Sequence, residues 1–174
     1  MKIYSVNGLE IYETRHATIK QTIEYAACHN IPLLRADLRR VNMRGAKIDG
    51  IRLKDACLWG ADITGADMAG ADLSGVDFRA AFLKNTCLAE SNLHLADLRG
   101  AQVEGAIVRG ANLRGIQFSC PAFFALDLCD ASMDGAVYWH RGERATVLSD
   151  APYRLFSHYD TLYYSKKSQK IPGF

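Results

Sequence analysis

Histidine and cysteine are the side chains of this 174-residue chain best suited to acid–base, nucleophilic or metal chemistry. The five histidines are scattered along the sequence, and the five cysteines contain no C-x-x-C pair. Neither a glycine-rich phosphate loop nor a nucleophile elbow is found. Without a nucleophile–base pair or a ligand set, we expect no enzymatic activity, no metal and no cofactor.

Arginine and tryptophan indicate recognition chemistry instead, because they recur at steps of 20 residues as Arg39, Trp59, Arg79 and Arg99. A guanidinium can stack on an indole ring, and both residue types are common anchors of protein interfaces. If the fold places residues 20 apart side by side, these four form a partner-binding stripe in which Arg39 and Arg79 flank Trp59. The alternative is that aspartates two residues earlier neutralise three of the arginines as weak surface pairs: Asp37, Asp77 and Asp97.

The element that must position these residues is an internal repeat, with an apolar residue at every fifth position from Leu33 to Tyr138. Its 22 pentads have Leu at 11 centres, Ala two positions earlier in 13, Asp or Asn one earlier in 10, and Gly two later in 11. A period of five matches neither a helix nor a flat strand. It is satisfied if each pentad forms one side of a coil that turns a corner every five residues. Four sides then close a coil of about 20 residues, with the pentad centres inside.

The A-(D/N)-L-x-x pattern resembles the pentapeptide-repeat family, and it covers residues 31–140. The resemblance implies an all-β solenoid, a right-handed quadrilateral β-helix, which over this length has about 5.5 coils. It also implies a non-enzymatic protein. The best understood subset of the family binds DNA gyrase and related topoisomerases as a dimer, imitating duplex DNA with an acidic rod.

Residues 1–30 are expected to form an N-terminal cap on the coil at residues 31–140. Two short apolar segments around Asn7-Gly8 predict a hairpin, and Thr18 with Gln21 predicts the capping box of a helix that ends near Asn30. Because an open coil end is an unpaired edge, these elements would cover the first coil.

Residues 141–174 predict a C-terminal cap that contains a helix from Ala151 to about Ser165. The alternative, which the resemblance to the gyrase-binding subset implies, is that this segment pairs two subunits, and both roles are compatible. The residues expected to form the homodimer contact are Phe124, Trp139, Leu155, Phe156, Tyr159, Leu162 and Tyr163.

Charge varies along the coil, although the whole chain has a formal net charge of only +2. A duplex mimic needs a long acidic face, which this sequence does not provide. Four aspartates at Asp62, Asp67, Asp72 and Asp77 fall on four different sides, and turn chemistry explains them best. Binding to nucleic acid or another anionic surface is the alternative, through Arg35, Arg39, Arg40, Arg44 and Arg52 of the first coils.

We therefore expect a protein-interaction module that binds and modulates a protein partner. That partner could be a DNA gyrase or other type II topoisomerase, or another host enzyme inhibited by a phage- or mobile-element-encoded protein. No apolar run is long enough to span a membrane and no secretory signal is recognisable, so we expect a cytoplasmic location.

Overall fold

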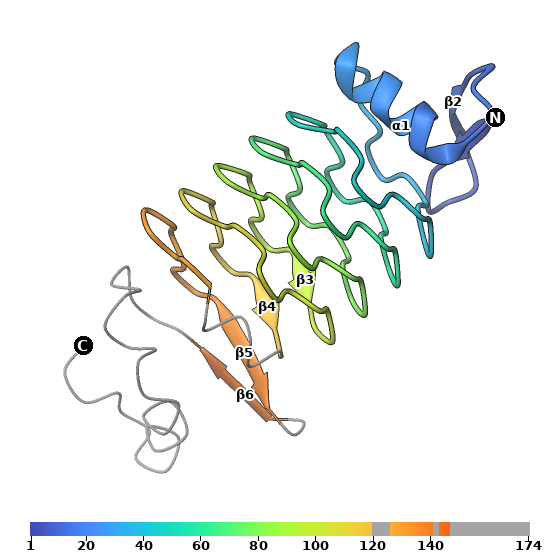
Figure 1. Cartoon of the computed structure of the whole chain (residues 1–174). Coiled ribbons are helices and arrows are strands. Elements are labelled where there is room, and N and C mark those ends of the chain that lie inside the picture. Colours follow the sequence, from blue (N-terminus) through green and yellow to red (C-terminus); the bar gives the residue numbers. More distant parts are fainter. Residues whose placement is uncertain (120–125, 141–142, 147–174) are drawn as a thin grey trace, which may run out of the picture.

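The computed structural model describes residues 1–119, 126–140 and 143–146. Its elements are two short strands, β1 (Lys2–Tyr4) and β2 (Glu10–Glu13), the helix α1 (Ile19–Cys28), and four later strands. The later strands are β3 (Asp97–Leu98), β4 (Gln117–Phe118), β5 (Val137–His140) and β6 (Glu143–Thr146). Between the helix and β5 the chain winds as a stack of loops along one axis, which gives the molecule the form of a rod (Figure 1).

Successive loops pair in parallel with a constant step of 20 residues, as the sequence predicts. Bridges join Asp37 to Cys57, Cys57 to Asp77, and Asp77 to Asp97, and equivalent bridges form on the other sides of the coil. The Leu38 N–H donates to the Cys57 carbonyl at 2.8 Å, and the Cys57 N–H donates to the Ala36 carbonyl at 2.9 Å. Each side contributes only one or two paired residues per coil before the chain turns, so most of the rod carries isolated bridges rather than strands.

The core consists of two inward positions per pentad, the centre and the residue two before it. Leu53, Leu73 and Leu93 stand above one another in one file, and all three are completely buried. Alanine at the second position keeps the interior narrow, and Thr86 and Ser91 replace it in two pentads. Their hydroxyls donate to the carbonyls of Ile63 and Leu88 at 2.9 and 2.7 Å, which satisfies these buried polar groups.

The corners of the coil have positive φ angles, which favour glycine. Gly75, for example, has a φ of 67°, and an added Cβ would clash with Oδ1 of Asp55. In the part of the coil that the structure describes, eight further corners carry side chains in this left-handed conformation: Arg35, Arg40, Asp55, Ala80, Asn85, Glu90, Leu95 and Asp130. The stacked backbone hydrogen bonds impose the corner geometry even where the residue disfavours it.

Where an aspartate precedes a pentad centre it stabilises the turn, as expected for the four aspartates from Asp62 to Asp77. The Oδ1 atoms of Asp62, Asp67 and Asp72 accept from the N–H two residues later at 3.1–3.2 Å. Asp77 does the same with Arg79 at 3.0 Å. Local turn chemistry therefore explains this ring of carboxylates.

The hairpin and helix expected before the coil are both present. β1 and β2 pair antiparallel around the Asn7-Gly8 turn, and Thr18 and Gln21 form both hydrogen bonds of the capping box. The helix ends at Cys28, two residues earlier than Asn30, where φ reaches 54°.

Both elements contact the first coil. Ser5 bridges Ala36 antiparallel, the Asp37 N–H donates to the Tyr4 carbonyl at 2.7 Å, and Oε1 of Glu24 accepts from the Lys47 N–H at 3.1 Å.

The opposite end of the rod also has an antiparallel strand. β3, β4 and β5 are parallel at the 20-residue step, and β6 pairs antiparallel with β5, so that Trp139 lies opposite Arg144 in the register (Figure 1). One side of the coil is thus continued by antiparallel strands at both ends, by β1 beside Ala36 and by β6 beside β5. The expected C-terminal helix and most of residues 141–174 lie outside the described residues.

Candidate partner-binding face

The predicted stripe lies on the side of the coil that β1 and β6 extend. Arg39, Trp59, Arg79 and Arg99 each follow a buried centre and point outward, one coil apart. Trp139 occupies the same position two coils beyond Arg99. We call the outward surface formed by these five residues the arginine–tryptophan face.

Three of the arginines are held by the aspartate two residues earlier. Nε and Nη2 of Arg79 donate to the two carboxylate oxygens of Asp77 at 2.9 and 2.7 Å, and the backbone N–H of Arg79 donates to Oδ1. Asp37–Arg39 and Asp97–Arg99 have the same arrangement. The expected aspartate–arginine pairs are confirmed, and their two-pronged geometry fixes each guanidinium close to the coil surface.

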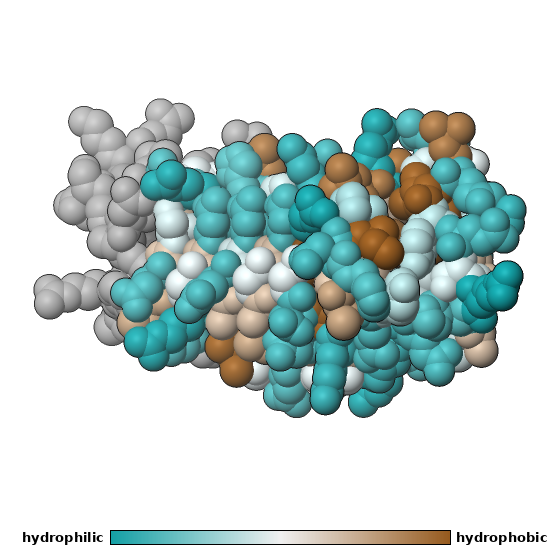
Figure 2. All heavy atoms as spheres, turned by 90° about the horizontal axis from the view of Figure 1, so that it is seen from above, coloured by the Kyte–Doolittle hydropathy of each residue, from teal (hydrophilic) through white to brown (hydrophobic). Residues whose placement is uncertain are grey.

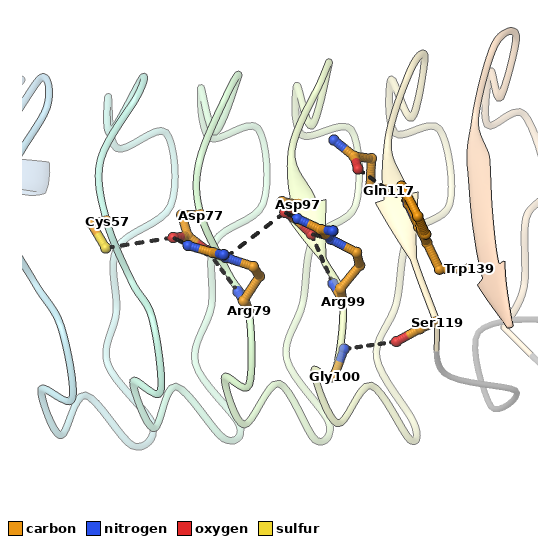
Figure 3. Close-up of polar contacts among 9 residues, drawn as sticks. All are labelled: Cys57, Asp77, Arg79, Asp97, Arg99, Gly100, Gln117, Ser119 and Trp139. Atoms are coloured by element: carbon orange, nitrogen blue, oxygen red, sulfur yellow. Dashed lines mark hydrogen bonds and ion pairs between the residues drawn. The ribbon is translucent and has the colours of Figure 1, made fainter. Parts of the chain in front are cut away.

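The pairs are also connected from coil to coil. Nε of Arg79 lies 3.8 Å from Oδ2 of Asp97, and the Cys57 thiol lies 3.8 Å from Oδ2 of Asp77 (Figure 3). Carboxylate and guanidinium groups therefore alternate along the rod from Asp77 to Arg99, which makes this part of the face nearly neutral despite its arginines.

The stacking partner of Trp59 differs from the prediction. We expected Arg39 and Arg79 to flank the indole, but the guanidinium over the ring is that of Arg40, with Cζ 4.6 Å from the ring centroid. Arg39 and Arg79 are bound by their own aspartates, whereas Arg40 stands at a corner with a φ of 55° and forms no ion pair within the described residues. Its guanidinium is the one that can lie on the indole.

Trp139, which is also one of the expected dimerisation residues, belongs to the same face. Its ring lies 5.2 Å from Cζ of Arg99, and its indole N–H donates to Oε1 of Gln117 at 3.2 Å (Figure 3). Between the two coils stands the small Ser119, whose hydroxyl accepts from the Gly100 N–H. The signal for this contact was the 40-residue spacing of Trp139 from Arg99 with a small residue midway.

Electrostatics explain why the pairs persist at neutral pH. The hydrogen bond from Arg39 lowers the pKa of Asp37 below its ordinary value. Burial raises the pKa of Asp77, but the hydrogen bonds from Arg79 outweigh it, and the net shift is downward. Burial raises the pKa of the Cys57 thiol, so this cysteine is not an activated nucleophile.

The remaining site residues predicted from the sequence are the basic residues of the first coils and the dimerisation residues. Arg35, Arg44 and Arg52 lie in the first coils and hydrogen-bond to Asn7, Asp62 and the Asn30 carbonyl respectively. The other dimerisation residues lie outside the described part of the chain: Phe124, Leu155, Phe156, Tyr159, Leu162 and Tyr163.

Within the described residues, no group of three or more His, Cys, Asp or Glu side chains is placed to hold a metal ion. No helix in that part of the chain is both long and apolar enough to cross a bilayer.

Comparison with known proteins identifies the repeat. Eight copies of the pentapeptide repeat match residues 33–60, 56–94 and 80–115. Residues 33–115 therefore consist of pentapeptide repeats, and the resemblance predicted from the pentads is confirmed. Proteins of this family fold as right-handed quadrilateral β-helices, in agreement with the 20-residue coil. They are protein-interaction modules and generally not enzymes.

Several solved structures of the same family are similar to the chain. A pentapeptide repeat protein from the cyanobacterium Cyanothece 51142 is 19% identical, with a TM-score of 0.45, over 70% of this chain and 96% of that one. A trypsin-treated variant of QnrB1, a plasmid-mediated fluoroquinolone resistance protein, is 27% identical, with a TM-score of 0.46, over 57% of this chain and 46% of that one. A pentapeptide repeat protein from the Arabidopsis thaliana thylakoid lumen is 30% identical, with a TM-score of 0.37, over 46% of this chain and 59% of that one. Among curated proteins, no match was found.

Proposed function

We propose that this chain is a non-enzymatic binding protein that modulates a protein partner through the arginine–tryptophan face. The observation that carries the proposal is the placement of Trp59 and Trp139 on one side of the rod, each beside a guanidinium. Tryptophan and arginine together are the residues most enriched at the energetic centres of protein interfaces. The aspartates fix the neighbouring arginines, so less side-chain entropy is lost when a partner binds.

A type II topoisomerase such as DNA gyrase is one partner that the family resemblance implies, and inhibition of another host enzyme is the second. The neutral aspartate–arginine pairs favour a partner surface with planar or apolar groups over a strongly basic DNA-binding surface. A gyrase supercoiling assay with added protein separates the two, because an unchanged rate at micromolar protein would exclude gyrase as the target.

We also propose that the hairpin and α1 cap the first coil and that the chain forms a homodimer through its carboxyl-terminal residues. The contacts of Tyr4 and Glu24 with the first coil support the cap. Sedimentation of the full chain at several concentrations tests the dimer, and a single monomeric species throughout would refute it.

Affinity capture from the native host tests the face itself. The wild type is compared with a variant that carries Trp59→Ala and Arg79→Ala, and with a matched control that carries Phe82→Ala and Arg114→Ala on other sides of the coil. Phe82 is 40% exposed, so the control removes one exposed aromatic residue and one exposed arginine. We expect the partner to be lost only with the first variant. Equal recovery with both variants would refute the proposed face.

A further inference from the structure

Exposed hydrophobic residues lie among hydrophilic ones at the N-terminal end of the rod (Figure 2), and a second surface is found at this end. Leu9, Val6 and Leu34 are 69%, 43% and 47% exposed, which is unusual for three neighbouring aliphatic residues of a small protein. They adjoin Arg35 and Lys54, and we call these five residues the turn patch.

The hydrogen bonds of the hairpin turn bring these residues together. The Val6 N–H donates to the Arg35 carbonyl at 2.8 Å, and a guanidinium N–H of Arg35 donates to Oδ1 of Asn7 at 3.3 Å. The turn closes when the Ser5 N–H donates to the Leu9 carbonyl at 2.7 Å. Leu34 and Lys54 occupy the same position in successive coils, and the Arg35 N–H donates to the Lys54 carbonyl at 2.9 Å.

The charge of the turn patch is positive and largely uncompensated. Neither Arg35 nor Lys54 forms an ion pair within the described residues. Asp55 follows Lys54 in the sequence, whereas Glu10 beside Leu9 is already paired with Lys2 at 2.7 Å. The guanidinium of Arg52, which precedes Lys54 by two residues, bonds to the neutral Asn30 carbonyl and adds a further positive charge.

We propose that the turn patch binds the surface of a bilayer that contains anionic lipid, with Leu9 and Val6 entering the interface and Arg35 and Lys54 contacting the headgroups. Protruding aliphatic side chains next to uncompensated basic ones are the combination that interfacial binding uses. Tyr4 is 46% exposed on the adjoining strand and has the amphipathic character of a residue at this depth.

A nucleic acid fits this surface less well. Phosphates would engage the basic groups, but the exposed aliphatic side chains of the turn would remain in water. The proposal goes beyond the protein-binding function, because the turn patch includes none of the five residues of the arginine–tryptophan face.

Co-sedimentation of the full chain with vesicles tests the proposal, using phosphatidylcholine alone and phosphatidylcholine with phosphatidylserine at about 0.15 M ionic strength. We expect binding only to the vesicles with phosphatidylserine. Lys54→Gln should lower the partition coefficient about fivefold, since one basic residue near an anionic surface contributes about that factor. Leu9→Ser combined with Lys54→Gln should lower it further.

The matched control carries Leu95→Ser and Arg114→Gln, because Leu95 is 58% exposed and both residues lie several coils away. Circular dichroism melting curves establish that every variant is folded. The proposal is refuted if neither vesicle binds, or if the control lowers binding as much as the turn-patch variant. It is also refuted if Lys54→Gln leaves vesicle binding unchanged and instead weakens binding to a duplex oligonucleotide or the self-association of the chain.

Discussion

Replacing Asp77 by Asn tests whether the aspartate–arginine pairs hold the arginine–tryptophan face together. The substitution keeps an oxygen that can accept from the Arg79 backbone N–H, but it removes the negative charge that the guanidinium contacts at 2.7 and 2.9 Å. A hydrogen bond to a charged group contributes about 1.5–3 kcal/mol when it is shielded from water. The Arg79 side chain is 48% exposed, so solvent screening reduces this to about 1 kcal/mol.

The pH dependence of this loss has a defined sign. The folded-state pKa of Asp77 is lower than the unfolded value of about 3.9, so the charged carboxylate stabilises the fold above that pH. This stabilisation disappears as the pH falls through the folded pKa. The free energies of unfolding of wild type and Asp77→Asn should therefore differ by about 1 kcal/mol at pH 7 and converge below about pH 4.

Urea unfolding followed by circular dichroism, at pH 7 and below about pH 4, measures the difference in the free energy of unfolding between wild type and Asp77→Asn. Asp67→Asn serves as the control. Asp67 accepts from the Ala69 N–H at 3.1 Å but has no ion pair within the described residues, so its loss should stay within about 0.5 kcal/mol. A difference for Asp77→Asn that is the same at pH 7 and in acid would show that shape, and not charge, explains the effect. A loss for Asp67→Asn equal to that for Asp77→Asn would assign the stabilisation to the turn alone.

Three further changes test the coil and its N-terminal elements by denaturant unfolding or amide exchange. Leu73→Ala should lower the free energy of unfolding by about 3 kcal/mol, because Leu73 is fully buried between neighbouring coils. Leu95→Ala on the surface should lower it by less than about 0.5 kcal/mol, and equal losses would refute the 20-residue register. Gly45→Ala should cost about 1 kcal/mol from its φ of 59° alone, since an added Cβ meets no atom within 4 Å. Thr18→Ala should cost α1 about 1 kcal/mol and accelerate amide exchange in its first turn, and unchanged exchange at Gln21 would contradict the capping box.

The sequence alone was enough to predict the coil, because a five-residue register has few physical solutions. An apolar residue at Leu53, Leu73 and Leu93 must face the same interior, and only a coil of 20 residues stacks them. The Asn7-Gly8 turn and the Thr18 capping box could also be predicted from the sequence, since both depend on residues close together in the chain.

The details of the face were less predictable because they depend on competition among side chains. Spacing placed Arg39 and Arg79 next to Trp59, but each had a carboxylate two residues earlier that binds a guanidinium more strongly than an indole does. Arg40 was left to stack, and nothing in the repeat distinguishes it except the absence of such an aspartate. The residue types of Ala80 and Leu95 do not indicate their left-handed corner conformation. The backbone hydrogen bonds between stacked coils outweigh the cost of this conformation, which is about 1–2 kcal/mol for a residue other than glycine.

The outward positions of the coil fall into two classes on the arginine–tryptophan face. The position before each centre is occupied by a turn-stabilising aspartate in the coils of Leu38, Phe78 and Leu98, so an arginine at the next outward position is neutralised and fixed. Where Cys57, Gln117 or Val137 takes the aspartate's place, no carboxylate precedes the outward residue of that coil. The indole of Trp59 lies in the coil of Cys57 beside the guanidinium of Arg40, and that of Trp139 lies in the coil of Val137 beside Arg99, which Asp97 holds. The repeat thus supplies rigidity at the paired coils and places the half-buried aromatic rings at the unpaired ones, which is the arrangement a preorganised binding surface requires.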